Sequence, residues 1–427
     1  MSEHSDTMAP TLRSGQASET VDNQSGQASK TVDNRSGQAS KTADDQTAPA
    51  IDTPDTANGA EGAAAKAVVN KATTKIILGV TAAKGYYIEQ MDIVTALLYR
   101  PLEEEVYVEQ PTGFSAKGKE ELVCLLNKAL YRLKQSPRIW YKTISTTLKG
   151  LGFQRSEYNH GLFINHKKPA YITLYVNDIH LIGPDKEYIN LVKANMASHY
   201  KIKDLGPTVS YLGLEISRNQ ANRTLTISQK LYIKSVLEAH GMADCKPALT
   251  PMETGIVLQR SDEEYTLSQD FTTRYQSMLG SIIYIMLQTQ PDIAYAVSKL
   301  SQYSSKPNEK HLQALKLILW YLSGTKDLGL TFNGKGKVEI TGWTNSSWGC
   351  NIDNGKSISG YIFQLYGGSV SWSSQKQVTV AKSTCKAEYM GQSDAASEAV
   401  WICGLLEDLG LFPNRPTTLN ADNQGAI

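Results

Sequence analysis

Aromatic residues are confined to one side of a sharp boundary in this chain. All 35 of them (7 Phe, 6 Trp and 22 Tyr) lie at or after Tyr86, and residues 1–70 contain neither an aromatic residue nor a cysteine. Large apolar side chains are what a folded core buries, and segments that lack them stay disordered. A core can therefore form only in the later part of the chain, and we expect residues 1–70 to be a disordered tail.

The tail also differs from the rest of the chain in charge. Residues 1–70 carry ten acidic and five basic residues, whereas the remainder carries 38 basic and 32 acidic residues. The formal net charge of +1 therefore combines an acidic tail with a mildly basic body. The pentapeptide Ser-Gly-Gln-Ala-Ser begins at Ser14, Ser25 and Ser36, a period of 11 residues. Such a period can indicate a helical supercoil, but the repeat offers too few apolar residues, and we prefer disorder.

Several classes of protein are excluded by composition. The chain has no run of 18 apolar residues, so we expect no membrane span, and Met1–His4 does not resemble a secretory signal. Five scattered cysteines without a CxxC pair indicate reduced thiols. We therefore expect an intracellular protein, in the cytoplasm or nucleus, that is not secreted. The small net charge does not by itself predict nucleic-acid binding.

Helical and strand-like patterns alternate after residue 70 and predict an α+β fold. The expected helices are 74–83, 139–151, 188–200, 230–240, 271–303 with a break at Pro291, 309–323 and 387–409. The expected strands are 87–93, 170–176, 180–183, 211–217, 223–228, 330–332, 338–341, 360–364, 369–372 and 417–420. Asn177 and Asp178 are the expected turn pair of one hairpin.

Two aspartates stand where β-elements end. Asp92 closes a strand-like segment and Asp178 lies at the tip of the hairpin. Polymerases bring such carboxylates together around two Mg²⁺ ions about 3.5–4 Å apart, because Mg²⁺ prefers carboxylate and phosphate oxygens. Aspartates at a strand end and in a turn are also ordinary surface features, and spacing alone leaves both interpretations open.

Longer stretches around these aspartates are more specific. They are Gln90–Leu98, Leu102–Phe114, Leu130–Tyr141, the Tyr-Val-Asn-Asp sequence at 175–178, Leu205–Pro207 and Tyr211–Ile216. In this order and spacing they resemble the palm of reverse transcriptases from copia-type LTR retrotransposons. The resemblance runs from about Thr73 to the end of the chain.

The resemblance implies roles for individual residues. Asp92 is similar to the first metal-binding aspartate, Asn177 stands where the family has its second catalytic aspartate, and Asp178 is the neighbouring aspartate. Leu97 takes the place of an aromatic residue that usually blocks a ribose 2′-hydroxyl.

A second group of residues is implied to meet the substrates. Lys134, Gln135 and Arg138 resemble the segment near the incoming nucleotide and template. The implied cofactor is Mg²⁺, with Mn²⁺ as an alternative. The implied partners are a primer–template or RNA–DNA hybrid and dNTPs.

The C-terminal part resembles the ribonuclease H of the same family. Residues 342–349 are similar to its first strand, 383–390 to the start of its central helix and 421–427 to the end of a later strand. Glu388 and Asp422 match metal ligands, while Asn345 takes the place of the first aspartate. We expect this unit to be truncated, without its last acidic ligand.

Departures from the family pattern argue against activity. Asn177 lacks the charge that concentrates Mg²⁺, Leu97 is not planar, and Arg132 replaces a family glycine. The basic fingers segment of the family is expected upstream of the palm, where this chain has its acidic tail.

The expected organisation has four parts. They are the tail (1–70), a partial reverse transcriptase with palm and thumb-side elements (71–255), a helical connection (256–327) and a truncated ribonuclease H-like domain (328–427). The predicted function is a copia-type reverse transcriptase/ribonuclease H fragment impaired by Asn177 and Asn345, so whether it is an enzyme stays open. The alternatives are a non-catalytic nucleic-acid-binding or interaction protein and a translated pseudogene remnant. The oligomeric state cannot be inferred from the sequence.

Overall fold

The computed structural model describes residues 68–102, 104–114, 117–131, 133–261, 268–334, 336–413 and 415–427. The repeats of the predicted tail and the predicted role of Arg132 lie outside the described residues. Two compact units are distinguished. The described part of the first belongs to Pro101–Ala129, where β2 (Tyr107–Val108) pairs with β3 (Cys124–Leu125). The second contains Leu130–Ile427 and the described residues up to Arg100.

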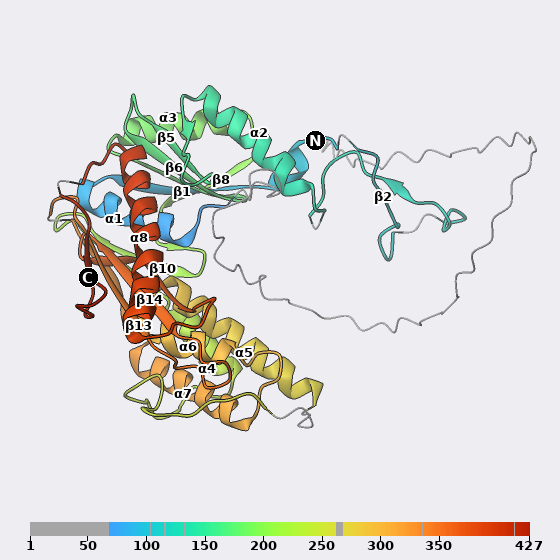
Figure 1. Ribbon diagram of the computed structural model, residues 1–427. Helices are drawn as coiled ribbons and strands as arrows, with labels where there is room; N and C mark the ends of the chain where they lie inside the picture. The colour runs from blue at the N-terminus through green and yellow to red at the C-terminus, as the bar shows by residue number, and fades with distance from the viewer. Residues whose placement is uncertain are drawn as a thin grey trace, which may run out of the picture. The chain divides into compact units, whose positions relative to one another are not determined.

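The second unit contains a six-stranded sheet in the order β4-β5-β6-β7-β1-β8 (Figure 1). Its strands are β1 (Tyr87–Ile93), β4 (Gln154–Arg155), β5 (Leu162–Asn165), β6 (Ala170–Tyr175), β7 (Asp178–Gly183) and β8 (Ile202–Pro207). The helices α2 (Ser136–Gly150) and α3 (Lys186–Ala197) cover one face, where Trp140, Ile144 and Val192 pack against β1, β6 and β7.

Helix α2 begins earlier than its apolar pattern indicates. The pattern predicts a helix from residue 139 after a proline-broken turn, but Pro137 lies in the first turn of α2. A proline is tolerated there because its missing N–H would have no partner within the helix. The predicted break is therefore a helix start.

The opposite face of this sheet packs against α1 (Lys71–Lys84) and a second sheet in the order β12-β11-β10-β9. Its strands are β9 (Ser210–Tyr211), β10 (Leu214–Asn219), β11 (Thr224–Ser228) and β12 (Gly329–Asn333). Before α1, Val69 is buried, and the side chain of Asn70 accepts a hydrogen bond from the Thr73 amide and caps the helix. These residues, which the sequence places in the tail, are part of the described core region.

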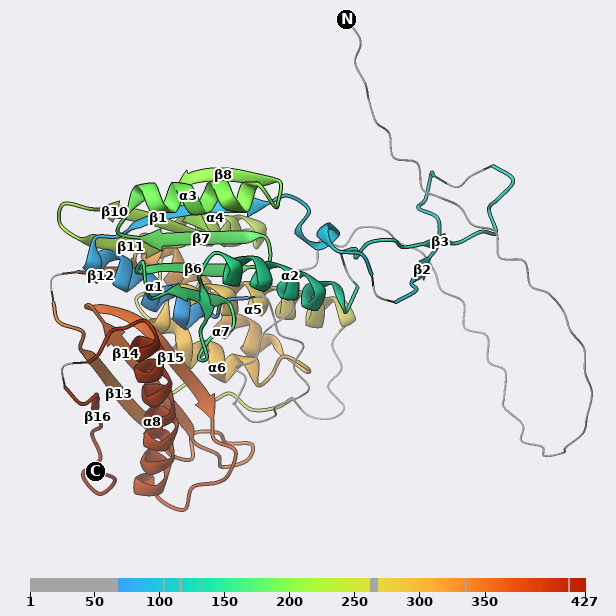
Figure 2. The ribbon, with the colours of Figure 1, turned by 90° about the horizontal axis from the view of Figure 1, so that it is seen from above.

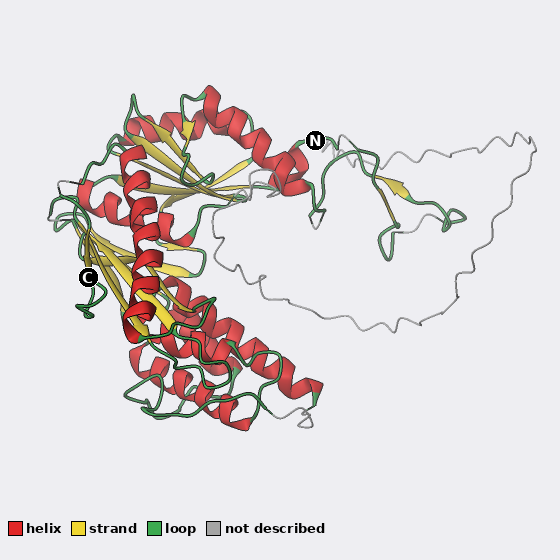
Figure 3. Cartoon of the chain, viewed as in Figure 1, coloured by secondary structure: helices red, strands yellow, loops and turns green. Residues whose placement is uncertain are grey.

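Four helices form a separate apolar cluster that contains no strand (Figure 3). They are α4 (Lys230–Ala239), α5 (Gln269–Gln288), α6 (Ala294–Ser301) and α7 (Glu309–Thr325). A short 3₁₀ turn at Pro291–Ile293 separates α5 from α6, as the predicted break at Pro291 requires. Within the described ranges, no helix combines the length and apolar character that a membrane span needs.

The C-terminal residues form a third sheet in the order β15-β14-β13-β16 with α8 (Thr384–Asp408) packed against β13 and β14 (Figure 2). The strands are β13 (Ile340–Ser347), β14 (Ile358–Leu365), β15 (Gly368–Lys376) and β16 (Thr418–Asn420). β16 runs parallel to β13, and the other two pairings are antiparallel. The mixed α and β architecture predicted from the sequence is confirmed at this level.

A buried lysine connects three of these elements. Lys75 of α1 is 2% exposed, donates to the Leu287 carbonyl at the end of α5 (3.0 Å) and lies 4.3 Å from the ring centre of Trp372 on β15. The Trp372 indole donates to the Met286 carbonyl (3.0 Å). Burial, assisted by the nearby Lys71, lowers the pKa of Lys75 to about 7. Two of the carbonyls that the end of α5 leaves open, those of Met286 and Leu287, are thus satisfied by β15 and α1.

A buried carboxylate holds α3 against the six-stranded sheet. Glu89 of β1 is 3% exposed and pairs with Lys186 and with Lys193, whose ammonium lies 2.8 Å from Glu89 Oε2 and 2.6 Å from Asp204 Oδ1. A buried charge is tolerated when opposite charges and hydrogen bonds replace water.

Lys193→Met tests this arrangement. It leaves Glu89 with one partner in a dry site, so we expect the free energy of unfolding in urea to fall by about 3 kcal/mol. The double variant E89Q/K193M, which removes both charges, should lose less than K193M alone. Equal or larger losses in the double variant would contradict this account.

Candidate functional site

The predicted polymerase residues meet at one end of the central strands. β1 and β7 pair antiparallel with Asp92 directly opposite Asp178. The turn that joins β6 to β7 adds Asn177. All three side chains are partly exposed. The structure thus brings together the residues that the sequence selected as the catalytic group.

The turn itself is one residue earlier than predicted. Tyr175 pairs with Asp178, so the turn residues are Val176 and Asn177, and Asp178 is the first residue of β7. Val176 has a φ of 57°, a conformation that a β-branched side chain rarely adopts. Sequence propensity therefore argues against valine at this position.

Two hydrogen bonds hold the strained turn. The Trp140 indole of α2 donates to the Val176 carbonyl (2.7 Å), and the Ile93 amide of β1 donates to the Asn177 carbonyl (2.9 Å). Backbone strain of this kind persists only where surrounding contacts over-determine it. Sequence reasoning missed this role of Trp140, because the residue is distinguished only by its place on an amphipathic helix.

Asn177 makes a direct contact with the first aspartate. Its amide Nδ2 donates a hydrogen bond to Asp92 Oδ1. A carboxylate has no donor, so the amide nitrogen must face it for the contact to be attractive. The contact occupies one of the acceptor positions of the Asp92 carboxylate that a cation could use.

Asp178 is shifted toward its protonated form. Partial burial and the nearby Asp92 carboxylate raise its pKa, and a hydrogen bond with Gln90 opposes the shift. Gln90 is a neighbour on β1 that sequence reasoning missed; its place two residues before Asp92, on the same face of the strand, is the signal that could have identified it.

The predicted substrate residues are distributed differently. Leu97 lies in a 3₁₀ turn, Ala96–Tyr99, and is only 6% exposed, because it packs into the core with Trp140. Lys134 and Arg138 are exposed and flank the start of α2, while Gln135 at the N-cap of this helix is partly buried.

The second predicted acidic group assembles from β13, α8 and the segment after β16. Asn345 is exposed and its amide nitrogen lies 3.5 Å from Asp422 Oδ2. Glu388 is 5% exposed, and its Oε1 accepts a hydrogen bond from the Ser346 amide (3.0 Å). All three residues selected from the sequence are thus gathered near one end of α8.

Glu388 has an unsatisfied buried oxygen. Its Oε2 is buried and has no hydrogen-bond partner among the described residues. Burial, together with the nearby Asp422, raises the pKa of Glu388, although the Ser346 amide opposes the shift. A buried carboxylate oxygen without a donor is a group that a cation would satisfy.

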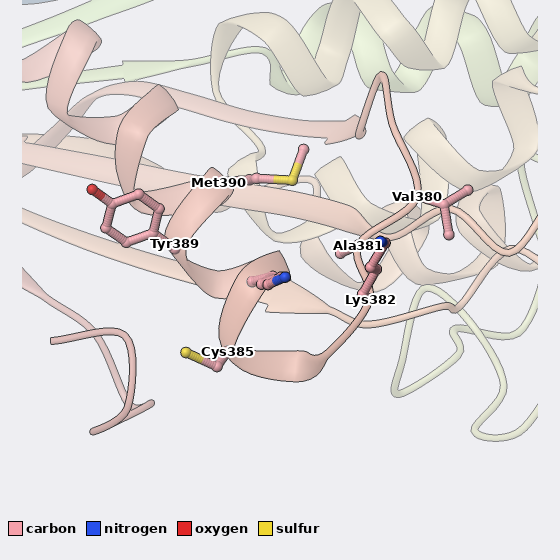
Figure 4. A pocket seen from close by; sticks show the side chains of 7 residues that line it. Val380, Ala381, Lys382, Cys385, Tyr389 and Met390 are labelled. Carbon is pink, nitrogen blue, oxygen red and sulfur yellow. The ribbon is translucent and has the colours of Figure 1, made fainter.

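An open pocket lies at the start of α8. It is lined by Val380–Lys382 of the preceding loop and by Cys385, Lys386, Tyr389 and Met390. Figure 4 shows Val380 on one side of the pocket and Cys385 and Tyr389 on the other. The pocket combines apolar surface with two exposed lysines, Lys382 and Lys386.

The two acidic groups differ in how well they suit a metal. No group of three His, Cys, Asp or Glu side chains in the described ranges could hold a metal ion. At the first group, Asn177 donates a hydrogen bond to Asp92 Oδ1, and the carboxylates are those of Asp92 and Asp178. At Glu388, the free buried oxygen and the neighbouring Asp422 fit a divalent cation better.

Comparison with known proteins identifies the family of the chain. The family model of reverse transcriptase (RNA-dependent DNA polymerase) matches residues 59–254. The chain is 36% identical over 366 residues to the retrovirus-related Pol polyprotein from transposon TNT 1-94 of Nicotiana tabacum, covering 84% of this chain and 27% of that protein. It is 37% identical over 361 residues to the corresponding RE1 polyprotein of Arabidopsis thaliana, covering 84% of this chain and 24% of that protein.

A shorter relative is covered completely. The chain is 32% identical over 311 residues to a putative transposon Ty5-1 protein of Saccharomyces cerevisiae, covering 72% of this chain and 100% of that protein. The chain spans only about a quarter of the length of the two plant polyproteins. From the family model, these relatives and the paired aspartates of β1 and β7, we conclude that the chain belongs to the reverse transcriptase family of copia-type retrotransposon Pol polyproteins.

Proposed function

We propose that this chain is an RNA-directed DNA polymerase fragment whose polymerase centre is impaired by Asn177. The observation that carries the proposal is the hydrogen bond from the Asn177 amide to Asp92 Oδ1. Reverse transcriptases generally use divalent metal ions and bind nucleic-acid templates and dNTPs. In this chain the amide takes a position where a carboxylate would attract a cation.

The electrostatic argument follows from the number of charges. Asp92 and Asp178 would hold the divalent metal ions, which would supply positive charge to the attacking 3′-hydroxyl and to the transferring phosphate. Asp92 and Asp178 supply at most two negative charges, and partial burial and the Asp92 carboxylate raise the pKa of Asp178, which disfavours the second charge. Asn177 adds none, and its N–H acts as a neutral substitute for the cation on Asp92. Asp92 is therefore hydrogen-bonded when no metal is present, and because this bond must be replaced on binding, the affinity of the site for metal is lower.

The surroundings still suit a nucleic-acid substrate. Lys134 and Arg138 are exposed at the start of α2, whose Trp140 holds the catalytic turn. We infer that these cations contact the phosphates of a primer–template. Leu97 is buried, so its influence on the ribose of a dNTP would be through packing of the turn after β1.

We infer a ribonuclease H-like unit from the third sheet. Three antiparallel strands are followed by α8 and by a strand that returns parallel to β13. Glu388 and Asp422 would hold the metal there, and the metal would supply the charge that activates water toward the RNA strand of a hybrid. Asn345 contributes an amide rather than a third carboxylate, which argues for impaired cleavage at this site too.

A second candidate is a nucleic-acid-binding protein without catalysis. Two observations together favour it. The apolar cores around both acidic groups are intact, yet each group contains an asparagine amide, that of Asn177 or Asn345, in place of a carboxylate. Such a protein would bind an RNA–DNA hybrid with salt-dependent affinity and incorporate no nucleotide.

Primer extension tests the proposed impairment by Asn177. The protein as it exists should incorporate dNTPs at the background of D92A, whereas N177D should raise Mg²⁺-dependent incorporation about 100-fold, because a lost charge in the site is restored. The control is D92A/N177D, which should return to background. Robust incorporation by the unmodified protein that disappears in D92A would refute the proposed impairment.

The raised pKa of Asp178 makes a prediction for stability against pH. A carboxyl whose folded pKa lies above its unfolded value stabilises the fold when protonated, and this contribution is lost as the pH rises through the folded pKa. Asp178→Asn should therefore unfold at a higher urea concentration than the unmodified protein at pH 7, and this advantage should shrink below about pH 4, near the unperturbed pKa of aspartate. The control is D185N at the exposed cap of α3, which should show no such gain at pH 7. An advantage of D178N that grows toward acidic pH would contradict the assignment.

The effect of Asn345 can be tested by cleavage of the RNA strand of an RNA–DNA hybrid. N345D should increase Mn²⁺-dependent cleavage of the RNA strand of a labelled hybrid, because a third carboxylate joins Glu388 and Asp422. The double variant N345D/E388Q should be silent. Cleavage that is unchanged between N345D and N345D/E388Q would show that this cluster is not the centre responsible.

A further inference from the structure

A basic pocket lies away from both acidic groups. It has a volume of about 610 Å³ and is lined by residues from four segments that are distant in sequence. Lys84 comes from the end of α1, Arg223 from the turn between β10 and β11, Lys337 from the connection between β12 and β13, and Tyr366 from the turn between β14 and β15. No acidic residue is among those that line it.

The three cations carry charge that the protein does not balance. None of them forms an ion pair with a carboxylate in the described part of the chain, and all three are exposed. Exposed lysines often serve only as solvated charges. Here, however, cations from three separate segments converge on a single cavity, where their repulsion is relieved by an anion.

The end of α1 does not supply that anion. A helix C-terminus carries roughly half a negative charge, and two of its carbonyls, those of Ala82 and Thr81, already accept hydrogen bonds from the Gly85 and Tyr86 amides. The remaining negative potential is smaller than three positive charges. Charge compensation by the helix therefore does not account for all three cations.

The backbone of Arg223 adds an independent observation. Arg223 has a φ of 53°, a left-handed conformation that favours glycine. Its carbonyl accepts a hydrogen bond from the Gly334 amide (2.8 Å), which ties the turn to the connection that carries Lys337. Strained residues that the surroundings hold in place are found preferentially at ligand-binding sites.

Gly334 and Gly336 let the chain approach closely at this place. A Cβ on Gly334 would lie 2.6 Å from the Ala82 carbonyl oxygen, so a side chain there would push the connection away from α1. Gly336 has nothing within 4 Å of its Cβ position and leaves one side of the pocket open. The two glycines thus allow the connection between β12 and β13 to lie close to α1 while the cavity remains accessible.

From these features, we propose that the pocket bounded by Lys84, Arg223 and Lys337 binds a phosphate group. A guanidinium fork with two ammonium groups matches the charge and the several acceptor oxygens of phosphate. The pocket is separate from the polymerase centre. Lys84 lies just before Tyr87, the first residue of β1, whereas Asp92 lies five residues further along this strand, about 17 Å at the rise of a strand. The phosphate belongs either to a nucleic-acid backbone or to a small free anion.

The test uses K84Q/R223G/K337Q. Glycine at 223 keeps the left-handed turn without strain, so the variant should fold while losing three charges. The matched control is K142Q/K246Q/K310Q, which removes three exposed lysines outside the pocket. Circular dichroism confirms that both are folded, and the milder single variant K337Q is measured alongside them.

Two measurements distinguish the sources of phosphate. In the first, inorganic phosphate should raise the melting temperature of the unmodified protein and of the control above that in chloride at equal ionic strength, and should not do so for the pocket variant. In the second, the pocket variant should bind a labelled RNA–DNA hybrid about tenfold more weakly at low salt, with a salt slope reduced by up to about three. A change in the second measurement alone identifies a nucleic-acid phosphate, and a change in the first alone identifies a small anion.

The hybrid measurement rests on the proposed function, and the phosphate measurement does not. Failure of the unmodified protein to bind a hybrid counts against the proposed function, while the phosphate measurement still decides the pocket. The pocket proposal is overturned if the pocket variant equals the unmodified protein in both measurements, or if the control loses as much as the pocket variant.

Discussion

The pairing of β1 with β7 is the contact on which the rest of this structure depends. It sets Asp92 opposite Asp178 and places the remaining residues of both strands alternately on two faces. Met91 and Ile179 face the core formed with α2 and α3, while Ile88 and Ile182 face the core shared with α1. A shift of one residue in this register would exchange the two faces and separate the aspartates. The position of the acidic group is thus fixed by the same packing that stabilises the fold.

Around this pair, the chain satisfies buried charge with its own groups. Glu89 is neutralised by Lys186 and Lys193, and Lys75 is held by a carbonyl and an indole. Asn177 does the same for Asp92 with a neutral amide. Glu388 is one of the exceptions, because its Oε2 has no partner among the described residues; buried atoms of Arg218 and Asp408 are others. The two acidic groups therefore differ in chemistry: the first is hydrogen-bonded by the protein, and the second has a free acceptor.

Much of this arrangement could be predicted from the sequence, for physical reasons that can be named. Asp92 and Asp178 were located because alternating strand patterns end at them, and the break at Pro291 followed from the missing N–H of proline. The hairpin turn was placed one residue late, because Asn177-Asp178 has better turn propensity than Val176-Asn177. The hydrogen bonds from Trp140 and Ile93 to this turn overcome the lower propensity. Both donors lie in distant segments, so the local sequence pattern does not predict these bonds.

Other features of the structure could not be predicted from the sequence, for related physical reasons. β8 was not predicted because Ile202–Pro207 is an exposed edge strand with charged residues and a glycine, and it lacks the apolar alternation of a half-buried strand. The burial of Glu388 could not be predicted either, because an acidic residue in the first turns of a helix is ordinarily solvated. Here the Ser346 amide and the neighbouring sheet bury it. The convergence of Lys84, Arg223 and Lys337 depends on three segments, distant in sequence, that meet in space.

The position of β12 has a practical consequence for dividing this chain. β12 follows the helical cluster and directly precedes the C-terminal sheet in sequence, yet it pairs with β11 along five residues from Gly329 to Asn333. A polypeptide cut before Gly329 would leave the backbone groups of β11 without their neighbour, and exposed strand edges recruit other chains. Such a piece would aggregate through that edge even though every residue of its six-stranded sheet were present. A cut between Asn333 and Ile340 would keep β12 on β11, but it would divide the apolar cluster that α1 shares with the C-terminal sheet.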